Sequence, residues 1–176
     1  MEKVEDQPCP ICSEKKLTLT EETTEIPYFG KAFIFSMSCN ACKFHKADVE
    51  AAEQHDPCKV TFTIEKESDL KVRIVKSSEA TVSIPQLRMK MTPGPASEGF
   101  VSNIEGLIDR FEKIVKDLKE TAEDDDEKTE AKNLLKKLWK VKCGDIPLKI
   151  IIEDPSGNSA IISDKAVIEK LKVKKE

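Results

Sequence analysis

The sequence predicts a mostly β protein with an inserted α-helical hairpin, in which an N-terminal four-cysteine zinc ribbon precedes a β domain. Two C-x-x-C pairs lie within the first 42 residues. Short runs that alternate apolar and polar residues fill 58–91 and return after Leu148. Between them, apolar residues recur at helical spacing. We therefore expect a ribbon module at 1–50 and a β domain at 51–176, with the helical hairpin at about 100–142.

The ribbon is predicted from the two cysteine pairs and the sequence between them. Residues 17–25 and 31–38 have strand-like patterns, with 26–30 as their connection. A C-x-x-C turn aims two sulfurs at one point, and two such turns complete a tetrahedral shell around one zinc ion. The predicted ligands are Cys9, Cys12, Cys39 and Cys42. With no open position the metal is structural, and it contributes folding free energy on the order of 10 kcal/mol.

Two other interpretations of the paired cysteines stay open at this stage. An iron site of rubredoxin type uses the same four ligands, and spacing alone does not separate it from zinc. A redox pair needs an exposed thiol at a helix N-terminus, whereas both pairs here have strand-like flanks. Cys58 and Cys143 lie outside the pairs and are expected to be buried free thiols, and His45 is expected at the surface.

The β domain is predicted from strands on both sides of the helical segment. Strands are expected at 60–64, 70–74, 80–84 and 87–91, and again at 148–152 and 160–162. The closing stretch is too short to form a sheet alone, so it must pair with the earlier strands. The turn at 154–158 is built from residues that favour turns.

Two helices are predicted between these strands. The first carries apolar residues from Phe100 to Leu118 and begins with a capping box formed by Ser102 and Glu105. The acidic run 123–127 is expected to be a solvated loop, and Gly144 suits the end of the second helix. The tail from Lys165 is expected to form a short helix and then fray.

Composition limits the function. The net charge of −4 and an aromatic content of 5% disfavour nucleic-acid binding by the whole surface. No segment is long and apolar enough to span a membrane, and the acidic N-terminus is not a secretory signal, so we expect a cytoplasmic protein. With two histidines and six glycines, no catalytic triad or phosphate-binding loop can be assembled, so we do not expect an enzyme.

Several motifs in order resemble the ZPR-type zinc-finger family. They are Ile26-Pro27-Tyr28-Phe29 and the segment 36–42 around the second pair, then 69–77, 80–87, Ile104-Glu105-Gly106-Leu107 and 153–159. The resemblance implies a zinc finger followed by a double-stranded β-helix domain that carries a helical hairpin. Eukaryotic members have two such modules in tandem, whereas this chain has one and resembles the archaeal members. It also implies binding to the GTPase elongation factor 1-alpha and a role in the folding of that factor.

The chain departs from the family pattern at a few positions. Ser13 and Lys43 replace the glycine that usually follows each cysteine pair, and glycine eases the positive φ of such a turn. Val72 stands where a basic residue is usual, with Arg73 next to it, and Gln86 replaces an acidic residue.

The expected function is a zinc-binding adaptor or chaperone for elongation factor 1-alpha. The alternatives are a nucleic-acid-binding zinc ribbon and, third, a metal-dependent enzyme. Two segments are candidate partner contacts, although a strand end and a hairpin turn explain the same residue types. The candidates are Lys76, Ser77, Asp154, Pro155, Ser156, Gly157 and Asn158.

Overall fold

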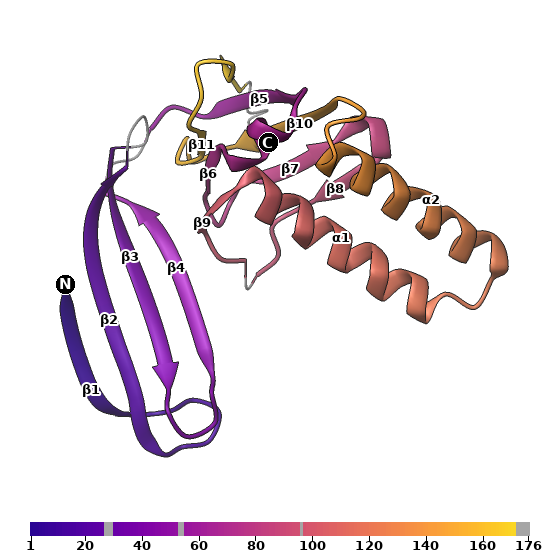
Figure 1. Ribbon diagram of the computed structural model, residues 1–176. Helices are drawn as coiled ribbons and strands as arrows, with labels where there is room; N and C mark the ends of the chain where they lie inside the picture. The colour runs from indigo at the N-terminus through magenta and orange to yellow at the C-terminus, as the bar shows by residue number, and fades with distance from the viewer. Residues whose placement is uncertain (27–29, 53–54, 96, 172–176) are drawn as a thin grey trace, which may run out of the picture.

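The computed structural model describes residues 1–26, 30–52, 55–95 and 97–171, and it contains two β parts and a projecting pair of helices (Figure 1). The first part holds β1 (Glu2–Pro8), β2 (Lys15–Ile26), β3 (Gly30–Cys39) and β4 (His45–Ala51). The second part begins with β5 (Cys58–Ile64), η1 (Glu67–Lys71), β6 (Arg73–Lys76), β7 (Thr81–Ile84), η2 (Pro85–Leu87), β8 (Met89–Met91) and β9 (Phe100–Asn103). It continues with α1 (Ile104–Thr121), α2 (Asp125–Lys142), β10 (Leu148–Asp154), β11 (Ala160–Ile161) and β12 (Val167–Lys170).

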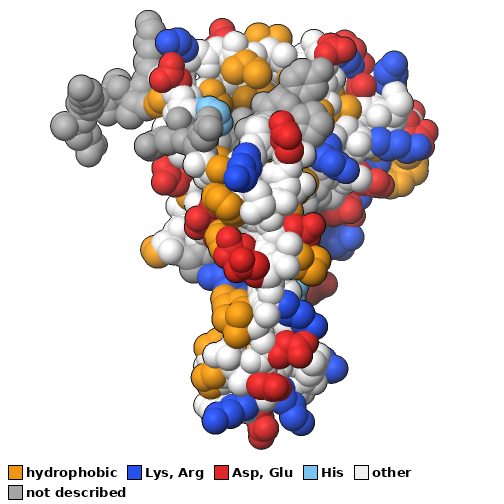
Figure 2. All heavy atoms as spheres, turned by 90° about the vertical axis from the view of Figure 1, so that its left-hand side faces the viewer, with side chains coloured by type: hydrophobic (Ala, Val, Ile, Leu, Met, Phe, Trp, Pro, Cys, Tyr) orange, Lys and Arg blue, Asp and Glu red, His pale blue; other side chains and the backbone are white. Residues whose placement is uncertain are grey.

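The first part is an antiparallel meander in which each strand pairs with the next along the chain. In this register Leu17 of β2 faces Cys39 of β3, and Ser38 faces His45 of β4. The turn after β1 and the turn after β3 therefore lie at one end of the sheet, away from the second part (Figure 1). From the side, this sheet forms a narrow stem below the wider domain, with charged side chains at its tip (Figure 2).

The second part is built from a five-stranded sheet, β12-β5-β10-β7-β8, and a three-stranded sheet, β11-β6-β9. Strand β10 pairs with β5 on one side and with β7 on the other, and β11 pairs with β6. Strands that follow the helices thus complete sheets that begin before them, as predicted. Fully buried residues from both sheets meet in one core, among them Phe62, Ile74 and Ile150.

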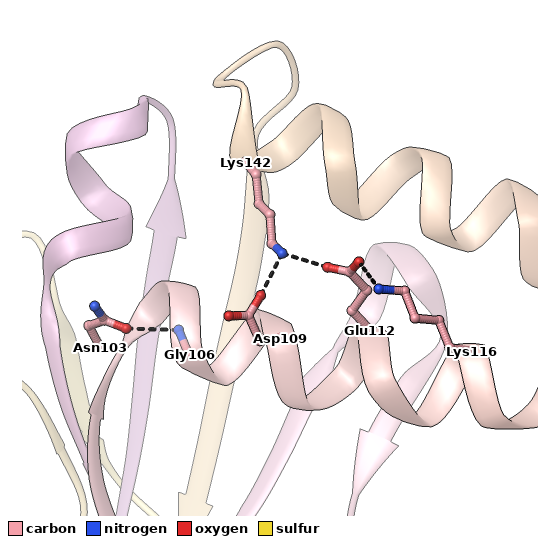
Figure 3. Close-up of polar contacts among 6 residues, drawn as sticks. All are labelled: Asn103, Gly106, Asp109, Glu112, Lys116 and Lys142. Atoms are coloured by element: carbon pink, nitrogen blue, oxygen red, sulfur yellow. Dashed lines mark hydrogen bonds and ion pairs between the residues drawn. The ribbon is translucent and has the colours of Figure 1, made fainter.

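The helical hairpin is anchored at its base. Asn103 caps α1 by accepting a hydrogen bond from the Gly106 amide, and Lys142 of α2 bridges Asp109 and Glu112 of α1 (Figure 3). Buried residues near the start of α1 and the end of α2 join the core of the β domain. They are Ile104, Leu107, Ile108, Phe111, Leu138 and Val141. The distal turns project into solvent and leave apolar side chains such as Leu118 exposed.

The predicted strand at 70–74 is wrong in its first half. The side chain of Asp69 accepts hydrogen bonds from the Glu65 and Lys66 amides and stabilises the 3-10 helix η1, which buries Leu70. Alternation alone misses such a local side-chain turn. The strand predicted at 87–91 is also shorter, because η2 occupies Pro85–Leu87 and Arg88 takes a positive φ of 53°.

Both helices start at other residues than the sequence predicted. The first helix begins at Ile104 with Asn103 as its cap, so Ser102 and Glu105 do not form a capping box and Phe100 belongs to β9. The acidic run is not a loop throughout: Asp124 caps α2, and Asp125 already lies in the helix. Carboxylates in a first helical turn are stabilised by the helix dipole, which favours this arrangement.

The chain ends differently from the prediction. Residues 167–170 form strand β12, which pairs with β5 from Val167↔Thr61 to Lys170↔Cys58, whereas a helix was expected. The open edge of β5 offers unpaired backbone groups, which a short helix would leave unsatisfied. The expected fraying beyond this strand and the connection at 27–29 fall outside the described residues. No helix in the described part of the chain has the length and apolar character needed to cross a membrane.

The hairpin supplies a matched pair of substitutions that test its anchoring. Ile108 is 0% exposed and Ile114, on the same helix, is 44% exposed. Ile108→Ala should lower the free energy of unfolding by about 2–5 kcal/mol, because it opens a cavity in the core, whereas Ile114→Ala should cost well under about 2 kcal/mol. Urea unfolding followed by circular dichroism measures both values. Equal losses of unfolding free energy in the two variants would contradict the burial of Ile108 in the core.

Candidate metal centre

Two turns at the tip of the stem carry the paired cysteines, and they share one backbone pattern. In the first, the Cys9 amide donates to Glu14 O at 3.0 Å and the Ser13 amide donates to Cys9 O at 2.9 Å. In the second, the Cys39 amide donates to Phe44 O at 2.8 Å and the Lys43 amide donates to Cys39 O at 3.1 Å. Because the sheet register brings the turns together, the two pairs of sulfurs face a common centre.

The four sulfur atoms form a closed cluster. All four Sγ atoms lie within 4.8 Å of one another, and the Cys9–Cys42 and Cys12–Cys39 pairs are each 3.7 Å apart. A tetrahedron with Zn–S bonds of about 2.3 Å has edges of about 3.8 Å, so the spacing fits a zinc ion. A disulfide requires sulfurs at about 2.05 Å, and all six cysteines are free thiols. The four predicted ligands therefore converge, and they hold one zinc ion.

The protonation of these thiols shows why the site takes a cation. Backbone N–H groups of Cys42 and then Ala41 lower the pKa of the Cys39 thiol to about 7, against the effect of burial. At Cys12 the Glu14 backbone acts to lower the pKa, but desolvation and the three neighbouring thiols raise it to about 12. Crowded sulfurs cannot all carry negative charge unaided, and a divalent cation replaces the protons when it binds.

Few apolar side chains surround the four cysteines. Cys9 and Cys39 are buried and Cys42 is exposed, while Leu17, Leu19, Met37 and Phe44 provide the nearby apolar contacts. His45 is exposed and bonds to Ser38 Oγ through Nδ1 at 2.9 Å, so it stays outside the cluster, as predicted. Cys58 is half-buried and Cys143 is exposed. The expectation that both are buried is therefore wrong, because Cys143 lies at the C-cap of α2.

The residues that replace glycine adopt the backbone conformation that glycine would favour. Ser13 has φ 61° and Lys43 has φ 62°, and both residues follow the second cysteine of a pair. The left-handed region costs an L-residue roughly 1–2 kcal/mol. Both turns thus store the strain that the departure from the family pattern predicts.

The candidate partner contacts at 76–77 and 154–158 also lie close together, but most of their side chains are buried. Lys76 and Ser77 lie at the end of β6 beside the turn that follows β10. Asp154, which is fully buried, accepts hydrogen bonds from Ser156 Oγ at 2.7 Å and Ser159 Oγ at 2.5 Å. The Ser77 amide in turn donates to Ser159 Oγ at 2.9 Å. This network fixes the turn, and its role in binding a partner remains a prediction.

The exposed part of that turn is small. Pro155 is exposed, Gly157 and Asn158 are half-buried, and Gly157 takes a φ of 71°. A Cβ atom at Gly157 would collide with Asp56 O, so the position requires glycine. Ser159 completes the network but was not among the candidate contacts, although it is the last residue of the motif at 153–159. Asn158 Oδ1 is buried and has no hydrogen-bond partner among the described residues.

Loss of one ligand should separate the two parts of the chain. Cys12→Ser should lower the zinc content to near zero and unfold the stem, since the metal supplies on the order of 10 kcal/mol, while the β domain keeps a cooperative transition. Zinc analysis and circular dichroism measure the two effects. Cys143→Ser, outside the cluster, is the matched control and should keep one zinc. Stoichiometric zinc in Cys12→Ser would contradict the four-ligand site.

The strained turns predict a stabilising substitution. Lys43→Gly should raise the stability of the stem by up to about 1 kcal/mol, because glycine adopts a positive φ without steric cost. Resistance of the zinc to a competing chelator reports the change. Lys43→Ala removes the same charge but keeps the Cβ atom, so an equal gain in that control would show that charge, not backbone strain, is responsible.

Comparison with known proteins agrees with this geometry. The ZPR1 zinc-finger domain model matches residues 3–57, and the ZPR1 jelly-roll domain model matches residues 68–176. A ZPR1-like protein of Methanocaldococcus jannaschii is 39% identical over 165 residues, covering 93% of this chain and 83% of that protein. A ZPR1-like protein of Pyrococcus horikoshii is 38% identical over 167 residues, covering 93% and 75%.

Eukaryotic relatives are more distant and longer. The zinc finger chaperone zpr1 of Schizosaccharomyces pombe is 34% identical over 147 residues, covering 78% of this chain and 30% of that protein. The jelly roll is the double-stranded β-helix that the motifs imply, and the range matched by its family model includes the helical hairpin. With both domain models matched in order and the four zinc ligands in place, the chain belongs to the ZPR1 family and carries one copy of the two-domain module.

Proposed function

We propose that this protein is a cytoplasmic adaptor or chaperone that binds the GTPase elongation factor 1-alpha, and that it is not an enzyme. The observation that carries the proposal is the closed four-sulfur centre at the tip of a projecting stem. The name of the S. pombe relative, a zinc finger chaperone, supports a role in handling other proteins.

The geometry of the centre supports binding over catalysis. Cysteine occupies all four coordination positions, so the zinc holds the turns in shape and leaves no position for a substrate or a water. Ile11, between two of the ligands, is 67% exposed. An apolar side chain on a turn that metal holds rigid is a preorganised contact for a protein surface, because little further entropy is lost on binding.

Charge supports a protein partner over a nucleic acid. The formal net charge is −4, and aromatic residues make up 5% of the chain. Phosphate contacts dominate the affinity of nucleic-acid-binding proteins, and a net negative protein gains little from them. Lysines do gather near the end of α2, but one of them, Lys142, is already paired with Asp109 and Glu112.

Affinity purification followed by mass spectrometry tests the proposal. The tagged chain and the control Cys143→Ser should both recover elongation factor 1-alpha, and Cys12→Ser should not, because its stem lacks the metal. Ile11→Ser keeps all four ligands and should recover about tenfold less if the exposed isoleucine is a central contact.

Two results would count against the proposal. One is a zinc-loaded protein that recovers no elongation factor. The other is recovery of RNA or DNA with a steep salt dependence, which would instead favour the nucleic-acid-binding function.

A further inference from the structure

A cleft separates the stem from the β domain, and its lining is unusually basic for a chain of net charge −4. It has a volume of about 600 Å³ and lies between β3 and β4 on one side and β6, β8, β9 and α1 on the other. We call it the junction cleft and define it by Ile34, Lys76, Met91, Phe100, Val101 and Arg110. No zinc ligand lines it, although its lining includes His45 and Lys46, which follow the second cysteine turn.

Lys76 is the unusual residue of this cleft. It is 2% exposed, its Nζ donates one hydrogen bond to Ser77 O at 2.8 Å, and it forms no ion pair with a carboxylate among the described residues. Burial, the largest influence, lowers the pKa of Lys76, and the charge of Arg110 acts in the same direction. A buried ammonium group whose direct acceptor is a neutral carbonyl lacks a contacting counter-charge.

Two carboxylates act on Lys76 from a distance, and each is occupied by other donors. Asp154 and, more weakly, Asp48 oppose the fall in the pKa of Lys76. The Asp154 carboxylate accepts hydrogen bonds from the hydroxyls of Ser156 and Ser159. The Oδ1 atom of Asp48 accepts the amides of the two residues Val49 and Gly99. Neither carboxylate pairs directly with Lys76, so its ammonium group has no carboxylate in direct contact.

Arg110 places a second cation at the same opening. Its guanidinium carbon lies 4.1 Å from the centre of the Phe100 ring, and the Lys76 Nζ lies 5.9 Å from that centre. Arg110 has no ion pair within the described ranges either, whereas the other lysine of the cleft, Lys46, is paired with Glu98. A guanidinium stacked on a ring keeps its in-plane N–H donors available for a bidentate carboxylate.

The basic lining continues past the cleft. A neighbouring cavity of about 580 Å³ shares Ile34 and Val101 with it and is lined by Lys71 and Arg73. Neither of these residues pairs with a carboxylate in the part of the chain that the structure describes, although Glu25 lies in the same lining. Cations therefore occur on both sides of an apolar wall, a pattern that suits an extended chain better than a single small ion.

We propose that the junction cleft binds an acidic polypeptide segment, with Lys76 and Arg110 as the residues that bind its carboxylates. The apolar wall accommodates an aliphatic side chain of that segment. A nucleic acid fits less well, because Arg110 already covers the Phe100 ring on which a base would stack. This inference goes beyond the proposed binding of elongation factor 1-alpha, and it does not depend on whether that factor is the partner.

The test uses the full zinc-loaded chain and a fluorescein-labelled peptide of alternating Asp, Glu and Leu, read by fluorescence anisotropy at low ionic strength. A twin peptide of Asn, Gln and Leu is the ligand control. Lys76→Met and Arg110→Gln should each weaken binding of the acidic peptide about tenfold or more, the effect of losing one charge-assisted hydrogen bond. Lys136→Gln, which removes an exposed lysine on α2, is the matched control and should bind like the parent chain.

Lys76→Met also has an expected effect that unfolding cannot imitate. Because it removes a buried charge that has no directly paired carboxylate, its melting temperature should equal or exceed that of the parent chain. Arg110 is exposed, so Arg110→Gln keeps the proposal testable whatever the stability of the Lys76 variant.

Several outcomes overturn the proposal: no binding of the acidic peptide, equal binding of the amide twin, or unchanged affinity in both cleft variants. Tighter binding of an oligouridylate that is lost in the same variants would assign the cleft to nucleic acid instead. Loss of peptide binding in Arg110→Gln supports the cleft whether or not elongation factor 1-alpha is recovered, so this inference and the proposed function can fail separately.

Discussion

Four sulfur atoms around one zinc ion hold the stem together, and the rest of its order depends on them. The buried apolar cluster at the tip contains only Cys9, Leu17 and Cys39 among the described residues, with a few half-buried neighbours. The stem's other buried apolar residues, Ile26, Ala32 and Val49, lie in a cluster shared with the β domain. Ordering a residue costs roughly 1–2 kcal/mol of backbone entropy, which so few buried side chains offset poorly over four strands. The β domain differs, because residues from both sheets and both helices share one large core. The stem is therefore the part of the chain whose fold is coupled to the metal.

The sequence predicted the fold best where periodicity and burial coincide. The alternation of Val60, Phe62 and Ile64 marks a strand with one fully buried face, and β5 has the predicted bounds to within two residues. The prediction failed where a single side chain redirects the backbone. Asp69 turns the chain at η1 and Asn103 sets the start of α1, and neither effect has a periodic signature. The edge strands β1 and β12 were missed, because their pairing depends on neighbours rather than on their own patterns.

The metal site could be predicted because its chemistry fixes its spacing. Two C-x-x-C pairs impose sulfur positions that few other structures require, and all four ligands converge as expected. The sequence analysis selected Lys76 as a candidate partner contact, whereas its unusual feature in the structure is its burial. Sequence reasoning placed it at an exposed strand end, whereas pairing of β6 with β9 sets it opposite Phe100 and buries it. Arg110 gave no signal at all, since a polar residue on a solvent-facing helix position is ordinary until tertiary packing places an aromatic ring beneath it.

The junction between the two parts links the metal to the cleft. Val49 of β4 packs against Val75 and Ala160 of the β domain, and the Gly99 amide donates to Asp48 Oδ1 at 2.6 Å. A Cβ atom at Gly99 would lie 2.5 Å from Val49 O, so this close contact needs glycine and sets how near the stem approaches. Strand β4 starts directly after the second cysteine turn, so the zinc that orders the turn also orders the strand that forms one wall of the junction cleft. Strand β4 thus connects the metal site to the proposed cleft, although no zinc ligand lines the cleft itself.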